Sequence, residues 1–401
     1  MEHRIKLCVI GGFLGSGKTT VILSIAGRLL DEGKKVGIVT NDKGSDLVDT
    51  DFLRREGFSV LEVAGGCFCC HFDEFIDRIK TMSEREMPDV ILAEPVGSCT
   101  DLFAAIVRPI LSNYGNTIVT SPLIVLADPR RIAREIAMEG KTSFTNEVSY
   151  LFRKQLEEGD IIALNKRDLL SDAEAENMIS YLRSKFPAAE LLSVSARSGM
   201  GVPDIVERLM LREAEEKGLM ELDYRIYKSA ERALGWLNGT CLLRTAAPID
   251  YSAVVVSFMD RTRSSFAGRG KEIAHLKLCG VTETEWVKSS VTASDPDQAD
   301  DPSRLCPPLK PASWMNVVIN ARILDEPDGI RETVERELSE TAAEYGLVIE
   351  GLHVEAFKSG NPNPLWRVAN MDRNLMDSIA RNGAALNTTA LNDITSNSSG
   401  R

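Results

Sequence analysis

The sequence predicts an α/β fold in which a domain with a parallel sheet is followed by a smaller α+β domain. Short apolar runs alternate with amphipathic stretches across residues 5–212, which is typical of parallel strands joined by helices. A glycine-rich turn directly follows the first of these runs. After a charged stretch at 212–217 the order of the elements changes. The sequence therefore predicts two domains of different architecture.

Each apolar run of the first region is expected to form a buried strand, because a short apolar run between amphipathic stretches fits a sheet covered on both faces. The runs are Lys6–Ile10, Val36–Thr40, Val60–Val63, Val90–Ala93, Leu123–Ala127, Ile161–Leu164 and Leu191–Val194. Parallel strands need crossover connections, so the stretches between several of them are expected to be helices.

The second region predicts a ferredoxin-like βαββαβ unit. Its expected elements are a strand at Leu237–Arg244, a helix from about Asp250, strands at Glu272–Gly280 and Trp314–Ile323, a helix at Gly329–Tyr345 and a strand at Val348–Phe357. The proline- and aspartate-rich segment Ser294–Ser313 is expected to be an exposed loop. We predict domains at residues 1–217 and 218–360 and an extension at 361–401, disordered from about residue 382 because polar and small residues dominate there.

One face of the second sheet is expected to be polar. In the strand at 273–280, His275, Lys277 and Cys279 alternate with apolar residues, so they share one face. The strand at 314–323 likewise turns Asn316, Asn320 and Arg322 to one side. Antiparallel sheets commonly expose one face to water. A solvated face is therefore the expectation, and a partner surface is the alternative.

The composition indicates a soluble globular protein. Hydrophobic residues make up 43% of the 401 residues, and 47 basic side chains stand against 59 acidic ones for a net charge of −12. This balance argues against a nucleic-acid binder, whose binding face would be basic. No apolar stretch approaches the ~18 residues of a membrane span, and the first apolar run is too short for a signal peptide. We expect a cytoplasmic protein without a membrane or nucleic-acid partner.

The glycine-rich turn matches the phosphate-binding pattern G-x4-G-K-T of P-loop proteins. It runs from Gly12 to Thr19 between an expected strand and an expected helix, the context that gives the pattern its meaning. Backbone N–H groups of such a turn surround phosphate oxygens at the positive end of the helix. Lys18 is expected on the outer phosphates and the Thr19 hydroxyl on Mg²⁺. The other expected nucleotide-binding residues of this turn are Gly12, Gly15, Ser16, Gly17 and Thr20.

Two motifs at later strand ends indicate guanine. Asn165, Lys166 and Asp168 form N-K-x-D after the strand at 161–164, and ligands of open α/β sheets bind at this edge. Asp168 can accept hydrogen bonds from the N1–H and amino group of guanine, which adenine lacks. Backbone amides of a second motif are expected at the guanine carbonyl, and that motif is Ser195, Ala196 and Arg197.

Acidic residues at strand ends are candidates for the Mg²⁺ site. Glu94 and Asp128 each end an apolar strand. We favour Glu94, because Gly97 can bring a backbone N–H close to the γ-phosphate, and we expect Asp128 to fix a loop. Asp42 and Asp49 lie where a switch segment belongs; an exposed acidic loop is an equal alternative for them, and Asp42 is the further expected Mg²⁺ ligand.

A cysteine cluster follows the strand at 60–63. Cys67, Cys69 and Cys70 occur within four residues after a glycine pair, so their thiols can converge on one Zn²⁺, Co²⁺ or Ni²⁺ ion. His71 or a water molecule could complete the tetrahedron. Buried structural cysteines and a redox pair remain alternatives. The scattered cysteines are expected to be structural, and they are Cys8, Cys99, Cys241, Cys279 and Cys306.

With GGFLGSGKTT, GGCFCC, EPVG, NKRD and SAR in this order, the chain resembles the CobW-type metallochaperone GTPases, which are related to the UreG and HypB nickel-insertion proteins. The resemblance implies a P-loop GTPase domain followed by a ferredoxin-like domain. It implies that Lys18 and Glu94 serve GTP hydrolysis, that Glu94 and Gly97 form a Walker-B-like element, and that Cys67, Cys69 and Cys70 hold a transferred metal.

The chain departs from the family pattern at two points. Asn41-Asp42-Lys43-Gly44 stands where the family has N-E-x-G, which shortens the acid by one methylene, and no histidine-rich stretch is present. Metal storage is therefore not expected. The segment EPVGSC resembles members associated with corrinoid enzymes, so the implied client is a metalloprotein or a corrinoid-dependent enzyme.

The sequence thus predicts a GTPase that uses Mg²⁺ and couples its nucleotide state to a transition metal, with Zn²⁺ favoured over Co²⁺ and Ni²⁺. Hydrolysis is expected to be slow without metal or partner, because no arginine finger or water-positioning glutamine is identified in the sequence. A regulatory GTPase with structural cysteines is the alternative, and a small-molecule kinase is a third. A homodimer remains open.

Overall fold

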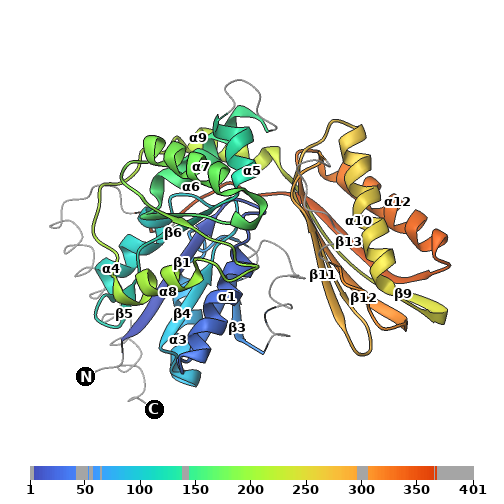
Figure 1. The fold of residues 1–401 in the computed structure, drawn as a ribbon, viewed down its shortest axis with the longest axis horizontal. Coiled ribbons are helices and arrows are strands. Elements are labelled where there is room, and N and C mark those ends of the chain that lie inside the picture. The colour runs from blue at the N-terminus through green and yellow to red at the C-terminus, as the bar shows by residue number, and fades with distance from the viewer. Residues whose placement is uncertain are drawn as a thin grey trace, which may run out of the picture.

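The structure is a computed structural model that describes residues 4–41, 53, 57–63, 66–137, 144–295, 306–364 and 366–367. It has two domains, each with its own sheet and apolar core (Figure 1). Asp42, Asp49 and the tail from residue 382 lie outside the described residues. Among the described residues, no helix combines the length and the apolar composition needed to cross a bilayer.

The first domain has a parallel sheet, as the sequence predicts. Its strands are β1 (Ile5–Gly12), β2 (Val36–Asn41), β3 (Ser59–Val63), β4 (Val90–Glu94), β5 (Ile118–Thr120), β6 (Ile124–Ala127), β7 (Ile161–Leu164) and β8 (Glu190–Ser193). They lie in the order β3-β2-β4-β1-β6-β7-β8, with β5 also paired to β1. The sequence did not reveal β5, since three residues are too few to show a period.

Helices cover both faces of this sheet. One face packs against α1 (Lys18–Asp31) and α8 (Val202–Leu211). The other packs against α3 (Phe72–Glu86), α4 (Arg108–Tyr114) and α6 (Asn146–Glu158). The remaining elements are α5 (Pro129–Ile132), α7 (Asp172–Lys185), the π-helical turns η1 (Phe103–Val107) and η2 (Ala133–Ala137), and the 3₁₀ turn η3 (Arg167–Leu169). Covering both faces explains why the strands read as continuous apolar runs.

The second domain has an antiparallel sheet with the expected ferredoxin-like core. Its elements are β9 (Gly235–Ile249), α10 (Tyr251–Gly268), β10 (Ile273–Val281), β11 (Trp286–Val291), β12 (Ala312–Ile323), α12 (Pro327–Glu344) and β13 (Val348–Lys358). The strand order is β11-β10-β12-β9-β13. The edge strand β11 was not predicted, because its Lys288-Ser289-Ser290 centre has no apolar alternation.

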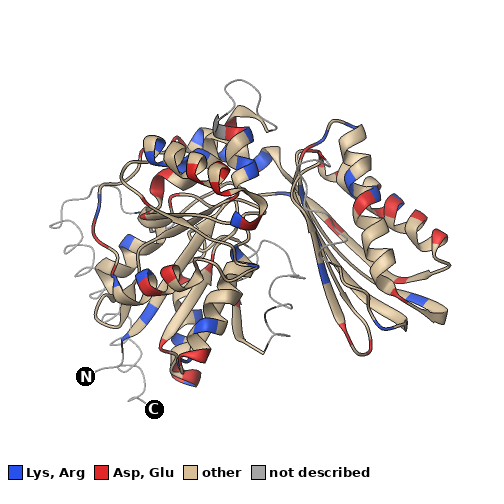
Figure 2. Ribbon diagram, viewed as in Figure 1, with Lys and Arg blue, Asp and Glu red and all other residues tan. Residues whose placement is uncertain are grey.

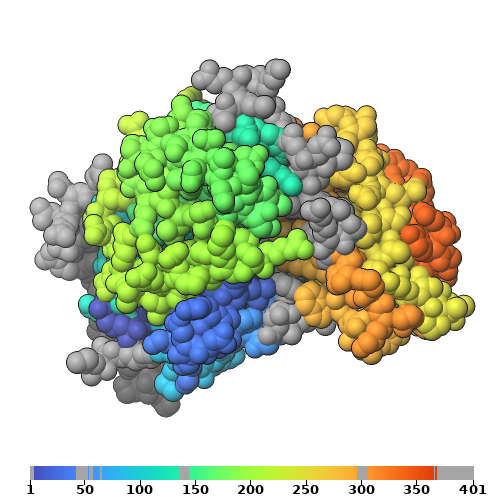
Figure 3. Space-filling model, in the orientation of Figure 1, coloured from blue at the N-terminus to red at the C-terminus, as the bar shows by residue number. Residues whose placement is uncertain are grey.

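The second domain turns its bare sheet face toward the first domain. Helices α10 and α12 pack on the outer face of the sheet and form its core (Figure 1). Before the sheet, α9 (Tyr224–Ala233) packs on the core of the first domain. Acidic and basic side chains are interspersed on the helices of both domains (Figure 2). The space-filling view shows the second domain, in yellow and orange, directly against the first (Figure 3).

Contacts beside the P-loop join the two domains. Arg134 pairs with Glu272 at 2.9 Å, and the Nη2 of Arg131 donates to the carbonyl oxygen of Thr292 at 2.7 Å. Gly15 packs closely against Thr292, since a Cβ built at Gly15 would lie 2.6 Å from Cγ2 of Thr292. The second domain therefore packs directly against the P-loop.

This arrangement overturns one expectation from the sequence. The polar face of the second sheet was expected to lie in water, yet His275 is 6% exposed and Arg322 only 1%. Both line a cavity shared with the first domain. Alternation in the strands correctly identified a polar face, but it carries no information about which other domain covers that face.

Candidate nucleotide and metal sites

The P-loop has the backbone conformation that its glycines permit. Gly12, Gly15 and Gly17 have φ angles of 135°, 79° and 91° between β1 and α1, a region that residues with a Cβ rarely adopt. The space is equally restrictive, since a Cβ at Gly12 would lie 2.6 Å from the carbonyl oxygen of Leu126. The loop is thus a tight cradle at the N-terminus of α1, the geometry that receives phosphate groups.

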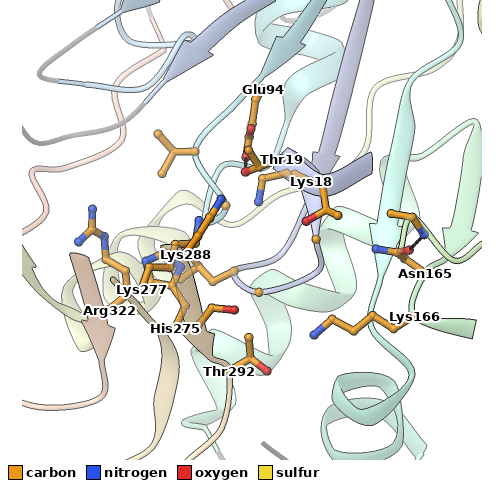
Figure 4. A pocket seen from close by; sticks show the side chains of 18 of the residues that line it. Lys18, Thr19, Glu94, Asn165, Lys166, His275, Lys277, Lys288, Thr292 and Arg322 are labelled. Carbon is orange, nitrogen blue, oxygen red and sulfur yellow. Dashed lines mark hydrogen bonds between the residues drawn. The ribbon is translucent and has the colours of Figure 1, made fainter. Parts of the chain in front are cut away.

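Lys18, Thr19 and Glu94 meet above this cradle (Figure 4). The Nζ of Lys18 donates to the carbonyl oxygen of Gly12 at 2.9 Å, and the Thr19 hydroxyl donates to Oε1 of Glu94 at 3.0 Å. Beneath them the hydroxyl of Ser16 is buried and has no hydrogen-bond partner among the described residues. A hydroxyl and a carboxylate side by side are oxygen ligands of the kind Mg²⁺ takes, so these residues fit that ion.

Gly97 approaches the end of the Lys18 side chain. A Cβ at Gly97 would lie 2.9 Å from Nζ of Lys18 and 2.8 Å from Cδ2 of Leu14. The turn after β4 therefore places its backbone beside the Lys18 amine, and the predicted contact of Gly97 with the γ-phosphate stays a prediction.

Asn165 connects the P-loop to the second guanine motif. Its Nδ2 donates to the carbonyl oxygen of Ser16 at 2.9 Å, and its Oδ1 accepts from the backbone N–H of Ala196 at 3.1 Å. The hydroxyl of Ser195 donates to Oδ1 of Asp168 at 2.6 Å. The structure thus brings N-K-x-D and S-A-R together at one end of the pocket and fixes the Asp168 carboxylate.

Asp128 lies behind this motif and orients it. Its Oδ2 is 2.9 Å from Nζ of Lys166, and its Oδ1 accepts from the backbone N–H of Arg130 as the N-cap of α5. Burial is the largest influence and would raise the pKa of Asp128, but the charge and hydrogen bond of Lys166, the charge of Arg131 and the N–H of Arg130 together outweigh burial, and the net pKa is lowered. The carboxylate therefore stays charged and holds Lys166 in its left-handed conformation, with φ of 57°.

A cavity of about 280 Å³ joins these groups to the second domain. The first domain contributes Gly15, Gly17, Lys18, Thr19, Thr20, Asn41, Glu94, Gly97, Asn165, Lys166, Asp168, Ala196 and Arg197 among its lining residues. Gly12, Ser16 and Ser195 are not part of the lining. Most of the residues predicted for nucleotide binding therefore face one space.

The residues of the other cavity wall were not predicted from the sequence. The second domain contributes Trp236, His275, Lys277, Lys288, Ser290, Thr292 and Arg322, several of which Figure 4 shows below and beside the P-loop. The Arg322 guanidinium stacks on Trp236 at 3.6 Å from the ring centroid and donates to the carbonyl oxygen of Ala321 at 2.7 Å. The cavity therefore meets basic side chains on both of its sides, which suits a polyanion.

The three clustered cysteines lie together on the turn between β3 and α3. The Sγ of Cys67 is 2.8 Å from that of Cys69 and 2.9 Å from that of Cys70, and Cys69 and Cys70 are 3.9 Å apart. All three are free thiols. Hydrogen bonds with Cys67 and the neighbouring thiols, together with burial, raise the pKa of Cys69 well above its usual value. A bound metal ion would displace those protons.

Asn41 links the cysteine turn to the nucleotide cavity. It ends β2 and lines the cavity. Its Oδ1 accepts from the backbone N–H of Phe68 at 2.9 Å, and its Nδ2 donates to the carbonyl oxygen of Val63 at 2.8 Å and to that of Gly66. One buried amide side chain therefore holds both ends of the turn that carries the thiols.

Cys99 corrects a second expectation. It was expected to be a scattered structural cysteine, but its Sγ and those of Cys67 and Cys69 all lie within 4.8 Å of one another. Cys99 follows β4, and only β2 separates β4 from β3 in the sheet. The carboxyl ends of parallel strands share one edge, and the position of Cys99 after its strand was a usable signal. Neither the predicted ligand Cys70 nor His71 is in that group, and the ring of His71 lies against Gly66.

Comparison with known proteins agrees with this geometry. The family model described as "CobW/HypB/UreG, nucleotide-binding domain" matches residues 6–193. The zinc chaperone CobW of Sinorhizobium sp. is 29% identical over 268 residues, which cover 58% of this chain and 74% of that protein. The zinc chaperone YeiR of Escherichia coli K12 is 33% identical over 166 residues, 40% of this chain and 46% of that protein.

A third relative is more distant. The zinc-regulated GTPase metalloprotein activator 1 of Dictyostelium discoideum is 22% identical over 292 residues, which cover 66% of this chain and 58% of that protein. The matched region of the family model spans the P-loop, the cysteine turn, Glu94 and the N-K-x-D motif. Residues 6–193 of this chain thus match the nucleotide-binding domain of the CobW/HypB/UreG family.

Proposed function

We propose that this chain binds and hydrolyses GTP and uses the nucleotide state to control a transition metal ion that it delivers to a client protein. The observation that carries the proposal is the position of Asn41, which lines the nucleotide cavity and also holds the cysteine turn. Nucleotide and metal sites joined through one buried side chain are physically able to influence each other.

The P-loop residues bind and orient the phosphates. Backbone N–H groups between Gly12 and Thr19 cradle them at the end of α1, and Lys18 leaves the carbonyl oxygen of Gly12 to reach the outer phosphates. Thr19 and Glu94 would hold Mg²⁺, with Asp42 from outside the described residues as a further ligand. When bound, Mg²⁺ neutralises charge that develops on the phosphate oxygens.

The base is selected at the opposite end of the cavity. The Asp168 carboxylate is fixed by Ser195 and can accept from the N1–H and amino group of guanine. Ala196 and Arg197 line the same space. The chain therefore prefers GTP over ATP, because adenine would leave the Asp168 carboxylate without its donors.

The metal ion is cargo held by Cys67, Cys69 and Cys70. Zinc is the favoured ion, because thiolates suit Zn²⁺ and the relatives are named zinc chaperones; Co²⁺ and Ni²⁺ are the other candidates. GTP binding tightens the metal site, and hydrolysis loosens it. A client metalloprotein, or a corrinoid-dependent enzyme, then receives the ion. Hydrolysis is slow until metal or client completes the site.

The burial of the thiols favours one second candidate. Cys67 and Cys69 are 4% and 2% exposed, as structural cysteines often are. In that case the chain is a regulatory GTPase that activates a corrinoid-dependent enzyme, and its cysteines only pack the turn.

Replacing Cys67, Cys69 and Cys70 together by serine separates the two candidates. In the chaperone account, Zn²⁺ accelerates GTP hydrolysis by the unaltered chain and has no effect on the variant. The matched control is Cys279→Ser, a buried cysteine of the second domain, which keeps the response. A triple variant that hydrolyses GTP with the same response to Zn²⁺ as the unaltered chain would establish the regulatory GTPase instead.

A further inference from the structure

We propose that Cys99 is a fourth thiolate ligand of the metal ion held by Cys67, Cys69 and Cys70, and that it is the ligand that moves with the nucleotide. Its role in coupling rests on the proposed function. Its role as a ligand does not, since it can be measured without nucleotide.

The sulfur positions fit a single ion. A tetrahedral zinc site with Zn–S bonds of about 2.3 Å places its sulfur atoms about 3.8 Å apart. The sulfurs of Cys67, Cys69 and Cys99 lie within 4.8 Å of one another, and Cys70 adds contacts of 2.9 and 3.9 Å to the first two. Cys70 is not in the group that includes Cys99, so a four-thiolate site requires the side chains of Cys70 and Cys99 to rotate toward a common centre, which their staggered rotamers allow.

Cys99 is buried beside these thiols. It is 3% exposed, against 4% for Cys67 and 2% for Cys69, and it shares a hydrogen bond with Cys69. Cys70 is half-buried, and four thiolate ligands together would leave no open coordination position for water. Such closed sites bind zinc tightly, so release of the ion requires one ligand to be withdrawn.

The turn that carries Cys99 is braced as one unit. The backbone N–H of Cys99 donates to the carbonyl oxygen of Val96 at 2.9 Å. The Nε2 of Gln155, which is buried in α6, donates to the carbonyl oxygens of Gly97 at 3.0 Å and Cys99 at 2.7 Å. A displacement at Gly97 is therefore transmitted to Cys99 instead of being absorbed between them.

The other end of this turn contacts Thr19 and Lys18, which are proposed to bind Mg²⁺ and the phosphates. Glu94 accepts from the Thr19 hydroxyl, and Gly97 lies against the Lys18 amine. Lys18 must change its position when phosphate enters, because its Nζ now donates a hydrogen bond to the carbonyl oxygen of Gly12 inside the P-loop. The turn from 94 to 99 therefore joins the phosphate site to one metal ligand, while the other three thiols stand on a separate turn after β3.

His71 is the competing fourth ligand. It follows Cys70 directly, and its Nδ1 is buried and has no hydrogen-bond partner among the described residues. Its ring, however, packs on Gly66, where a Cβ would lie 2.0 Å from Cε1. Cys99 needs no such departure from a packed position, and the geometry favours it.

Cobalt absorption tests the ligand assignment directly. Titration of the reduced chain with Co²⁺ gives a thiolate-to-cobalt band whose intensity per ion reports the number of Co–S bonds. We expect Cys99→Ser to lower that intensity by about a quarter and to weaken Co²⁺ binding by about tenfold or more. His71→Ala and the buried control Cys279→Ser should leave both values unchanged. A Cys99→Ser spectrum and affinity equal to those of the unaltered chain would overturn the assignment.

Two further measurements keep the result unambiguous. X-ray absorption of the unaltered, Zn²⁺-loaded chain needs no variant: four sulfur neighbours support the proposal, and three sulfurs with one lighter atom overturn it. The nucleotide link is tested by the ratio of Zn²⁺ affinities with a non-hydrolysable GTP analogue and with GDP, which we expect to differ from one in the unaltered chain and to approach one in Cys99→Ser. An unaltered chain with a ratio of one would contradict the proposed function, yet the sulfur count would still decide the role of Cys99.

Discussion

The backbone of Gly97 lies directly against the amine of Lys18, so closely that a Cβ at Gly97 would stand 2.9 Å from Nζ. Gly97→Ala should therefore displace the lysine or the turn. We expect GTP hydrolysis to fall by about tenfold or more, a loss of ~1.4 kcal/mol of transition-state stabilisation. Single-turnover rates measure this. The matched control is Gly218→Ala, where a Cβ meets nothing within 4 Å; equal rates for both variants would contradict the contact.

Asp168→Asn should change the base preference. The amide places a donor where the carboxylate accepted from the amino group of guanine, so GTP affinity should fall by about 100-fold, while XTP, which has a carbonyl at that position, should gain affinity. Competition with a labelled nucleotide measures both. Asp172→Asn is the control, because the side chain of Asp172 is 98% exposed. Unchanged GTP affinity in the Asp168 variant would place the base elsewhere.

The second domain should contribute to recognition of the γ-phosphate. Lys288 lines the nucleotide cavity from β11, and a cation there favours the nucleotide with the greater charge. We expect Lys288→Ala to weaken GTP binding several-fold and GDP binding less. Calorimetric titration with both nucleotides checks this. Lys310→Ala, at a side chain that is 74% exposed, should change neither, and equal losses for GTP and GDP in Lys288→Ala would argue against a phosphate contact.

Glu158 should make stability depend on pH. Burial and the neighbouring Asp101 raise the pKa of Glu158 to about 8, while Lys217 donates to its backbone carbonyl. The folded chain therefore holds a proton that the unfolded chain has released above its ordinary pKa near 4.5. Stability from this group is present below about pH 4.5 and is lost as pH rises toward 8. Glu158→Gln should lose less stability than the unaltered chain between pH 5 and 8 in thermal melts. Parallel melting curves would contradict the assignment.

The chain after β13 should shield the thiols. The backbone N–H of Asn363 donates to the Sγ of Cys70 at 3.3 Å, and Trp366 packs on Phe72 and donates to Asp73 at 3.0 Å. We expect Trp366→Ala to speed both thiol labelling and Zn²⁺ exchange, because the segment that covers Cys70 loses its anchor. Labelling of the metal-free chain with a thiol reagent measures the first. A labelling rate unchanged from the unaltered chain would show that the segment does not limit access.

Local patterns made much of the fold and the pocket predictable. The glycines at 12, 15 and 17 indicate a backbone with positive φ angles, which only glycine adopts easily. Short apolar runs indicate strands that are covered on both faces. The edge strand β11 could not be seen, because its centre is polar on both faces of the sheet. A motif that depends only on local conformation can be predicted from one segment of the sequence.

Features that depend on tertiary neighbours were not predictable in the same way. Cys99 is separated from Cys67 by a helix and a strand, so only the order of β3, β2 and β4 in the sheet brings the two together. Arg322 was correctly predicted to lie on a polar face, but the sequence of its strand does not indicate that the P-loop domain covers that face. Asp42 and Asp49 stay predictions, since they lie outside the described residues.

Coupling between the nucleotide and the metal ion can be measured by chelator competition. The Zn²⁺ affinity of the reduced chain is measured with Mg²⁺ and a non-hydrolysable GTP analogue, and again with Mg²⁺ and GDP. We expect Zn²⁺ to bind about fivefold or more tightly with the GTP analogue, which is the lower range of typical allosteric coupling. Equal Zn²⁺ affinities in the two nucleotide states would contradict it.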